Sequence, residues 1–236
     1  MPEGTQRVVG GTGCRAVKRP LLRLLAPARG AAVRLLERYL GVHSHDRSLY
    51  LASSWLTLHQ LFRGLEVAED DVFAEIGCAM GRVVFMASRR PFKQVIGLEQ
   101  DEELAAIARS NVQRSRPRQV CRDVRIVTVD AREWEIPDDL TVVYCFTMLR
   151  PEDFEALVAR LVESIRRHPR PLRFIYCMES LEDRQALETI GRARRIDYRV
   201  PRYIRHRFRD VSLYLLSPAS WDDEGLRGNE GLRGNG

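Results

Sequence analysis

The chain has 236 residues and a formal net charge of +6, and 44% of its residues are hydrophobic and 30% charged, which favours one globular domain of ordinary size with additional segments. No uninterrupted apolar run approaches the roughly 18 residues of a membrane-spanning helix, and basic residues break every apolar stretch near the N-terminus, so we expect neither a transmembrane segment nor a secretory signal peptide. The five cysteines form no C-x-x-C pair and no zinc-ligand spacing, so we expect reduced thiols, no metal site and a cytoplasmic location.

The first part of the chain is predicted to be helical after a short flexible arm. Residues 1–16 are glycine-rich and are expected to be flexible, whereas residues 17–40 and 48–66 carry apolar side chains at helical spacing. Residues 1–48 hold nine basic and three acidic residues, so this segment accounts for the whole net charge. Residues 17–66 are therefore predicted to form a helical cap, and adhesion to a membrane surface is an alternative role for its amphipathic helices.

From residue 67 to residue 218, short apolar runs alternate with amphipathic stretches. This alternation predicts an α/β fold, namely a doubly wound, mostly parallel seven-stranded sheet that ends in an antiparallel hairpin. The tandem repeat in residues 219–236 has no hydrophobic face and is predicted to be disordered. The predicted strands are residues 71–76, 94–98, 124–129, 141–146, 172–178, 193–200 and 210–217, and the predicted helices begin near Met80 and span residues 101–115 and 151–167.

A turn with two glycines follows the first predicted strand, within Phe73–Phe85 (FAEIGCAMGRVVF). Gly77 and Gly81 allow the backbone to bend tightly and a ligand to approach without meeting a Cβ atom. In open α/β sheets, ligands bind at this carboxyl edge. The dinucleotide pattern G-x-G-x-x-G fails, because Ala79 and Arg82 occupy its second and third glycine positions. The chain also contains no G-K-[ST], so the turn does not predict a pyrophosphate ligand.

Acidic residues end three successive predicted strands. Glu75 would repel a pyrophosphate but attract an amine or a sulfonium cation. Glu99 follows Gly77 by 22 positions and matches the acid that binds ribose hydroxyls, and Asp130 is placed to accept from an adenine amino group. A ligand with a ribose, an amine and a positive charge is S-adenosylmethionine. The alternative roles are an anion at a helix N-terminus for Glu75 and a capped turn for Asp130.

From Asp70 to Ser180 the chain resembles class I (seven-strand, Rossmann-like) S-adenosylmethionine-dependent methyltransferases, and within that class a bacterial group distantly similar to seven-strand histone lysine methyltransferases. The resemblance implies that the glycine turn lies against the methionine part of the cofactor, that the second-strand acid binds the ribose and that the third-strand acid lies near the adenine. The residues that carry it are DVFAEIGCAMGRVVFMA (71–87), PFKQVIGLE (91–99), IARSN (107–111), TVVYCF (141–146) and ESIRRHPRPLRFIYC (163–177).

Two departures from the family pattern affect the implied site. Ala79 replaces the usual central glycine of the turn, which adds one methyl group. Thr147-Met148-Leu149 stands where the group often has Asn-Pro-Phe, at the position that faces the transferred methyl group. A non-catalytic S-adenosylmethionine-binding protein therefore stays an alternative. The implied cofactor site comprises Glu75, Gly77, Cys78, Ala79, Gly81, Glu99, Gln100, Asp130, Ala131 and Phe146.

No residue identifies itself from the sequence as a catalytic base. A methyltransferase needs one only if the acceptor must lose a proton, because the sulfonium is already an electrophile. Thr147 and Tyr144 are candidates for a catalytic role by position alone. Tyr50 and Trp55 are candidate walls of the substrate pocket, with packing in the core as the alternative.

The expected acceptor of the methyl group is a small metabolite, because the chain beyond residue 48 is neutral and no nucleic-acid module is recognisable. A protein or nucleic-acid acceptor is the alternative, favoured by the basic N-terminal arm and by nine arginines in residues 184–209. Arg205 and Arg207 share one face of a predicted strand. They are candidate ligands of an anionic substrate, or else a solvated edge that discourages strand pairing.

Overall fold

A computed structural model of the chain describes Leu35 and residues 53–115, 118–146, 149–177, 180–190, 193–196 and 211–218. The chain divides into two units, Met1–Leu40 and Gly41–Gly236, and all elements below belong to the second. Apart from Leu35, the helices predicted over residues 17–40, most of the hairpin and the tail lie outside the described residues. In chain order the elements are α3 (Trp55–Gly64), β1 (Val72–Ile76), α4 (Arg82–Ser88), β2 (Gln94–Glu99), α5 (Glu102–Ser115), β3 (Val124–Thr128), β4 (Leu140–Phe146), α6 (Pro151–Arg167), β5 (Leu172–Cys177), α7 (Leu181–Thr189), β6 (Arg194–Ile196) and β7 (Val211–Leu216).

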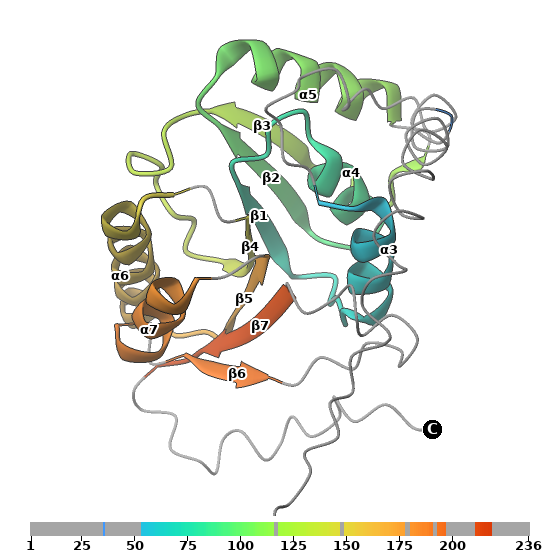
Figure 1. Cartoon of the computed structure of the whole chain (residues 1–236). Coiled ribbons are helices and arrows are strands. Elements are labelled where there is room, and N and C mark those ends of the chain that lie inside the picture. The colour runs from blue at the N-terminus through green and yellow to red at the C-terminus, as the bar shows by residue number, and fades with distance from the viewer. Residues whose placement is uncertain are drawn as a thin grey trace, which may run out of the picture. The chain divides into compact units, whose positions relative to one another are not determined.

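Seven strands form one sheet in the order β3-β2-β1-β4-β5-β7-β6 (Figure 1). The pairs between β3, β2, β1, β4 and β5 are parallel, whereas β7 pairs antiparallel with both β5 and β6. The predicted fold, mostly parallel with a C-terminal antiparallel hairpin, is therefore confirmed. The strand order reverses between β1 and β4, which is where open α/β sheets bind their ligands.

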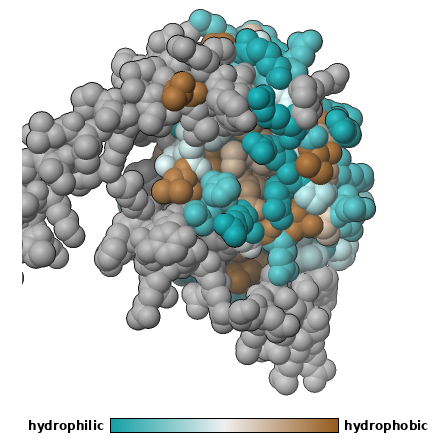
Figure 2. All heavy atoms as spheres, turned by 90° about the vertical axis from the view of Figure 1, so that its right-hand side faces the viewer, coloured by the Kyte–Doolittle hydropathy of each residue, from teal (hydrophilic) through white to brown (hydrophobic). Residues whose placement is uncertain are grey.

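Helices cover both faces of the sheet (Figure 1). On one face, α3, α4 and α5 pack over a cluster that contains Leu58, Phe62 and Val84. On the other face, α6 and α7 pack over a cluster in which Phe154 stacks on Tyr176 with ring centroids 5.0 Å apart. From the side of α3, the described surface is mainly hydrophilic with scattered hydrophobic residues (Figure 2), as expected for helices that bury only one side. No helix among the described residues is long and apolar enough to cross a membrane.

Two helices differ from the prediction, one in where it begins and one in being present at all. The helix expected over residues 48–66 begins at Trp55 in the described part. Its N-cap, Ser54, has extended backbone angles, although its side chain makes no capping hydrogen bond. Helix α7 was not predicted. Ser180 and Asp183 form a capping box at its start, so a short polar sequence becomes helical between β5 and β6 because its first backbone amides have partners.

A glycine in the middle of β2 allows α4 to lie close to the sheet. A Cβ atom at Gly97 would lie 2.7 Å from Val84 Cγ2, 2.9 Å from Cys78 Sγ and 2.9 Å from Ile126 Cδ1. These separations are shorter than any ordinary carbon contact. Gly97 therefore sets how deeply the start of α4 and the turn before it sit on the sheet.

We expect Gly97→Ala to lower the free energy of unfolding by about 1–3 kcal/mol, the usual cost of overpacking a dense core. Denaturant titration measures the loss. The Val84→Ala variant supplies the control, because it removes one of the three clashing groups. The double variant should therefore lose less stability than the sum of the two single variants. Strict additivity would show that the clash with Val84 is not the cause.

Candidate functional site

The turn from Gly77 to Gly81 joins the carboxyl end of β1 to the start of α4, and three of its residues are left-handed. The φ angles are 72° at Gly77, 46° at Ala79 and 79° at Gly81, and Ala79 is the one non-glycine with a positive φ among the described residues. A left-handed alanine costs about 1–2 kcal/mol relative to the right-handed conformation. Alanine in place of the family's usual glycine at position 79 therefore adds backbone strain as well as a methyl group.

The two glycines of the turn have different surroundings. A Cβ atom at Gly77 would meet nothing within 4 Å, and this residue is exposed, whereas a Cβ atom at Gly81 would lie 3.3 Å from Ala108 Cβ on α5. Gly81 therefore serves the close packing of α4 on α5. Gly77 leaves open space at the carboxyl edge of the sheet, where a ligand can reach the backbone.

Glu75 lies beneath the turn and is 5% exposed. Its Oε2 accepts a hydrogen bond of 3.1 Å from the backbone N–H of Val84, in the first turn of α4. Burial raises the pKa of the Glu75 carboxyl well above its usual range; the Val84 N–H opposes this rise, and the charge of Glu99 adds to it. The contact with a helix N-terminus is thus present, and a contact with the cofactor stays a prediction.

Glu99 ends β2, which pairs with β1, and is 8% exposed. Its Oε2 accepts from the backbone N–H of Ala79 at 2.8 Å, and its Oε1 accepts from that of Asp101 at 3.0 Å. The carboxylate therefore links the glycine turn to the residues that lead into α5. Gln100, the next predicted site residue, is exposed.

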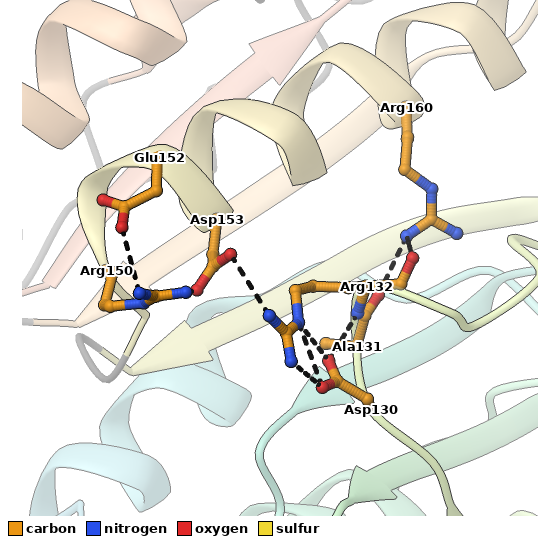
Figure 3. A network of polar contacts seen from close by, with 7 residues as sticks. All are labelled: Asp130, Ala131, Arg132, Arg150, Glu152, Asp153 and Arg160. Atoms are coloured by element: carbon orange, nitrogen blue, oxygen red, sulfur yellow. Dashed lines mark hydrogen bonds and ion pairs between the residues drawn. The ribbon is translucent and has the colours of Figure 1, made fainter.

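Asp130, after β3, is bound by the residue two positions on. Its carboxylate accepts from the backbone N–H of Arg132 at 2.9 Å and from the guanidinium at 2.5–3.1 Å (Figure 3). These hydrogen bonds lower the pKa of Asp130 to about 2. The capped turn that we considered as the alternative is therefore present, and the contact with adenine stays a prediction.

The loop after β3 is fastened to α6 by arginines (Figure 3). Arg160 on α6 donates to the carbonyl oxygens of Ala131 at 2.9 Å and Arg132 at 2.8 Å, and also to that of Trp134. The guanidinium of Arg132 lies 3.8 Å from Asp153, which Arg150 contacts at 3.1 Å. The sequence did not reveal the contacts of Arg160, since their acceptors are backbone oxygens. These contacts fix Ala131, a predicted cofactor contact, relative to α6.

Tyr144 and Trp55 have the surroundings of core residues. Tyr144 is fully buried with its hydroxyl 2.6 Å from Ser53 Oγ, and burial raises its pKa well above the usual range. Trp55 is buried and packs edge-on against Phe85 with ring centroids 5.8 Å apart. The packing alternative for Trp55 is therefore present, and the roles of Tyr144 in catalysis and of Trp55 in a substrate pocket stay predictions.

The remaining predicted residues fall into two groups. Cys78 is buried, which raises the pKa of its thiol, and Phe146 is half-buried at the end of β4. The described residues contain no group of three or more His, Cys, Asp or Glu that could hold a metal ion, and the metal-free expectation stays a prediction. Four predicted site residues lie outside the part of the chain that the structure describes, namely Tyr50, Thr147, Arg205 and Arg207.

Residues 73–168 match the model of a protein family described as a methyltransferase domain. The S-adenosylmethionine-dependent O-methyltransferase of Thermotoga maritima is 15% identical, with a TM-score of 0.53 over 75% of this chain and 71% of that one. Precorrin 8w decarboxylase of Methanobacterium thermoautotrophicum is 17% identical, with a TM-score of 0.52 over 75% and 97%. Both share the fold. No curated protein matches the chain, and the likeness to histone lysine methyltransferases stays a prediction.

The buried carboxyl of Glu75 predicts a pH dependence of stability. The pKa of this carboxyl is higher in the folded than in the unfolded state. Between these two pKa values the folded state therefore binds more protons than the unfolded state. The free energy of unfolding consequently falls as pH rises through this range. Glu75→Gln keeps an oxygen for the Val84 N–H but cannot ionise. We expect its melting temperature to fall less than that of the wild type between pH 5 and pH 8, and to be the higher of the two at pH 8.

Thermal melts across this pH range provide the measurement. Glu155→Gln is the matched control, because Glu155 is exposed on α6, and its curve should run parallel to that of the wild type. A Glu75→Gln curve that also runs parallel would contradict the prediction.

Proposed function

We propose that this chain, a class I S-adenosylmethionine-dependent methyltransferase, binds its cofactor at the Gly77–Gly81 turn and transfers the methyl group to a small molecule. One observation carries the binding site. Gly77 is exposed, with open space where a Cβ atom would stand. It begins a turn that follows the buried Glu75, and the buried Glu99 binds the same turn through the Ala79 N–H. The bound cofactor supplies a methyl group on a positively charged sulfur.

The two acids favour a ligand that carries positive charge. Glu75 and Glu99 are both more than nine-tenths buried, and the hydrogen bonds described above come to them from neutral backbone N–H groups. Burial raises the pKa of Glu75, and the nearby charge of Glu99 adds to the rise. A cation bound nearby would stabilise both ionised forms, which supports a sulfonium or ammonium group as the occupant.

The geometry of Glu99 also supports its role as the ribose ligand. Each of its oxygens accepts one backbone N–H, whereas a carboxylate offers about four acceptor positions in all. A ribose hydroxyl can therefore bind without displacing Ala79 or Asp101. The same carboxylate would then hold both the turn and the sugar, which fixes the distance between them.

Catalysis in this site depends chiefly on placement. The protein must hold the acceptor atom in line with the methyl group and exclude water. The network around Arg132 and Arg160 fixes the loop after β3, and the bonds of Glu75 and Glu99 fix the turn. The cofactor and the acceptor would thus bind beside two segments, the loop after β3 and the glycine turn, whose conformations are already fixed by hydrogen bonds.

The surface of the described domain supports a small acceptor. Many of its exposed basic side chains are paired with acids and are less available to a polyanion. The pairs are Lys93–Asp139, Arg109–Glu102, Arg125–Asp123, Arg132–Asp130, Arg150–Glu152 and Arg166–Glu163.

We expect titration calorimetry to detect S-adenosylmethionine and S-adenosylhomocysteine but no nicotinamide dinucleotide. Loss of a charged hydrogen-bond partner costs about 1.5–3 kcal/mol, so Glu99→Ala should bind the first two ligands roughly 10- to 100-fold more weakly. Glu155→Ala should bind them as the wild type does. Wild-type affinity in Glu99→Ala would remove Glu99 from the site.

The acceptor class is tested with a methyl-labelled cofactor in a cell extract separated into small molecules, RNA and protein. We expect the label among the small molecules, and no RNA gel shift that weakens between 50 and 200 mM salt. Label in RNA or protein would contradict the proposal and identify the acceptor class. Cofactor binding without labelling of any fraction would favour a non-catalytic binding protein.

A further inference from the structure

Both ends of α3 are fastened to α4 by an arginine that donates to a backbone carbonyl. Arg82, the first residue of α4, donates through Nη1 to Ser53 O at 3.0 Å. Arg90, just after α4, donates through Nη2 to Leu65 O at 3.1 Å. The two contacts are chemically alike, but they lie at opposite ends of the helix pair.

Only the Arg82 contact lies next to the glycine turn. Arg82 directly follows Gly81, is 7% exposed, and places its guanidinium 5.0 Å from the centre of the Trp55 ring. Trp55 in turn packs edge-on against Phe85 of α4. A guanidinium can stack on an aromatic ring and donate in its own plane at the same time, which the ammonium group of lysine cannot do.

Ser53 extends this contact to a third element. Its carbonyl oxygen accepts from Arg82, and its hydroxyl lies 2.6 Å from the hydroxyl of Tyr144 on β4. Tyr144 stands two residues before Phe146, where β4 ends at the predicted acceptor side of the site. The start of α3, the start of α4 and the end of β4 therefore meet through one serine.

The turn depends on such contacts, because Ala79 holds it in a left-handed conformation that alanine disfavours. Glu99 binds the Ala79 N–H at 2.8 Å, and Asn111 on α5 donates to the carbonyl of Met80 at 2.8 Å. These contacts hold the middle of the turn. Arg82 and Glu75 hold its exit, where the chain enters α4, because Glu75 accepts from the Val84 N–H and Arg82 donates to Ser53.

We propose that Arg82 is a positioning residue for the glycine turn, which it holds in the cofactor-binding conformation by clamping the start of α4 to Ser53 and Trp55. The inference rests on the proposed binding of the cofactor at this turn. Arg82 acts through the backbone of the turn and not on the reacting atoms. The equivalent clamp at Arg90 stabilises the same helix pair but has no such effect on binding.

The matched variants Arg82→Met and Arg90→Met separate the two roles. Each keeps an unbranched apolar stem and loses one arginine-to-carbonyl bond, so both should lower the melting temperature. We expect the dissociation constant for S-adenosylhomocysteine, measured by calorimetry well below both melting temperatures, to rise at least 10-fold in Arg82→Met. In Arg90→Met it should stay within twofold of the wild type. Arg82→Lys should fall between Arg82→Met and the wild type.

Hydrogen exchange read by mass spectrometry supplies a measurement that needs no ligand. Amides of residues 77–81 should exchange several-fold faster in Arg82→Met, and at the wild-type rate in Arg90→Met. Wild-type exchange in Arg82→Met, equal effects of the two variants on this segment, or affinity within twofold of wild type in Arg82→Met would overturn the inference. If the wild type fails to bind S-adenosylhomocysteine, the proposed cofactor site is wrong. The hydrogen-exchange data would still decide whether Arg82 positions the turn.

Discussion

Two carboxylates buried at the ends of neighbouring parallel strands constrain the whole carboxyl edge of this sheet. A buried carboxylate is costly unless hydrogen-bond donors surround it. For Glu75 the donor is the first turn of α4, and for Glu99 it is the glycine turn and the residue before α5. The acids therefore determine where two helices begin and how the turn between β1 and α4 is shaped. Gly97 and Gly81 allow the close packing that brings these donors within reach.

If Glu75 binds the cofactor as proposed, folding stability and function place opposite demands on its side chain. The N–H of Val84 lowers the cost of its charge but does not remove it, since the pKa stays well above the usual range. An apolar or amide side chain would suit the buried position better if folding were the only requirement. Groups that are costly in the folded state and lie in an open site are often those that a ligand needs. The proposed binding of a cationic cofactor at the glycine turn would give that cost a function.

The sequence predicted the parts of this site that depend on local order along the chain. Alternating apolar runs located the strands, and the same pattern placed Glu99 at the end of β2. Its role as the ribose ligand stays a prediction. Residues whose role depends on distant partners were not predicted. Arg82 was interpreted only as a misfit for a third glycine, although it clamps α3, which lies before β1 in the chain. Helix α7 was missed because its cap contributes more than its weak apolar pattern.

The arginines of the described domain also show why a high arginine content need not imply a nucleic-acid partner. Arg82 and Arg160 donate to backbone carbonyls in a loop and beside a helix end, which regular secondary structure leaves without a partner. Arg170, before β5, is buried, which lowers its pKa. It donates to the carbonyl oxygens of Leu140, Ser164, His168 and Pro137. A guanidinium has five N–H donors in a rigid plane, so one arginine can satisfy several carbonyls at once. Arginines used in this way count toward the net charge, but they are not free to bind phosphates. The charge that bears on the choice of acceptor is therefore the unpaired surface charge, and a count of the arginines in the described residues overestimates it.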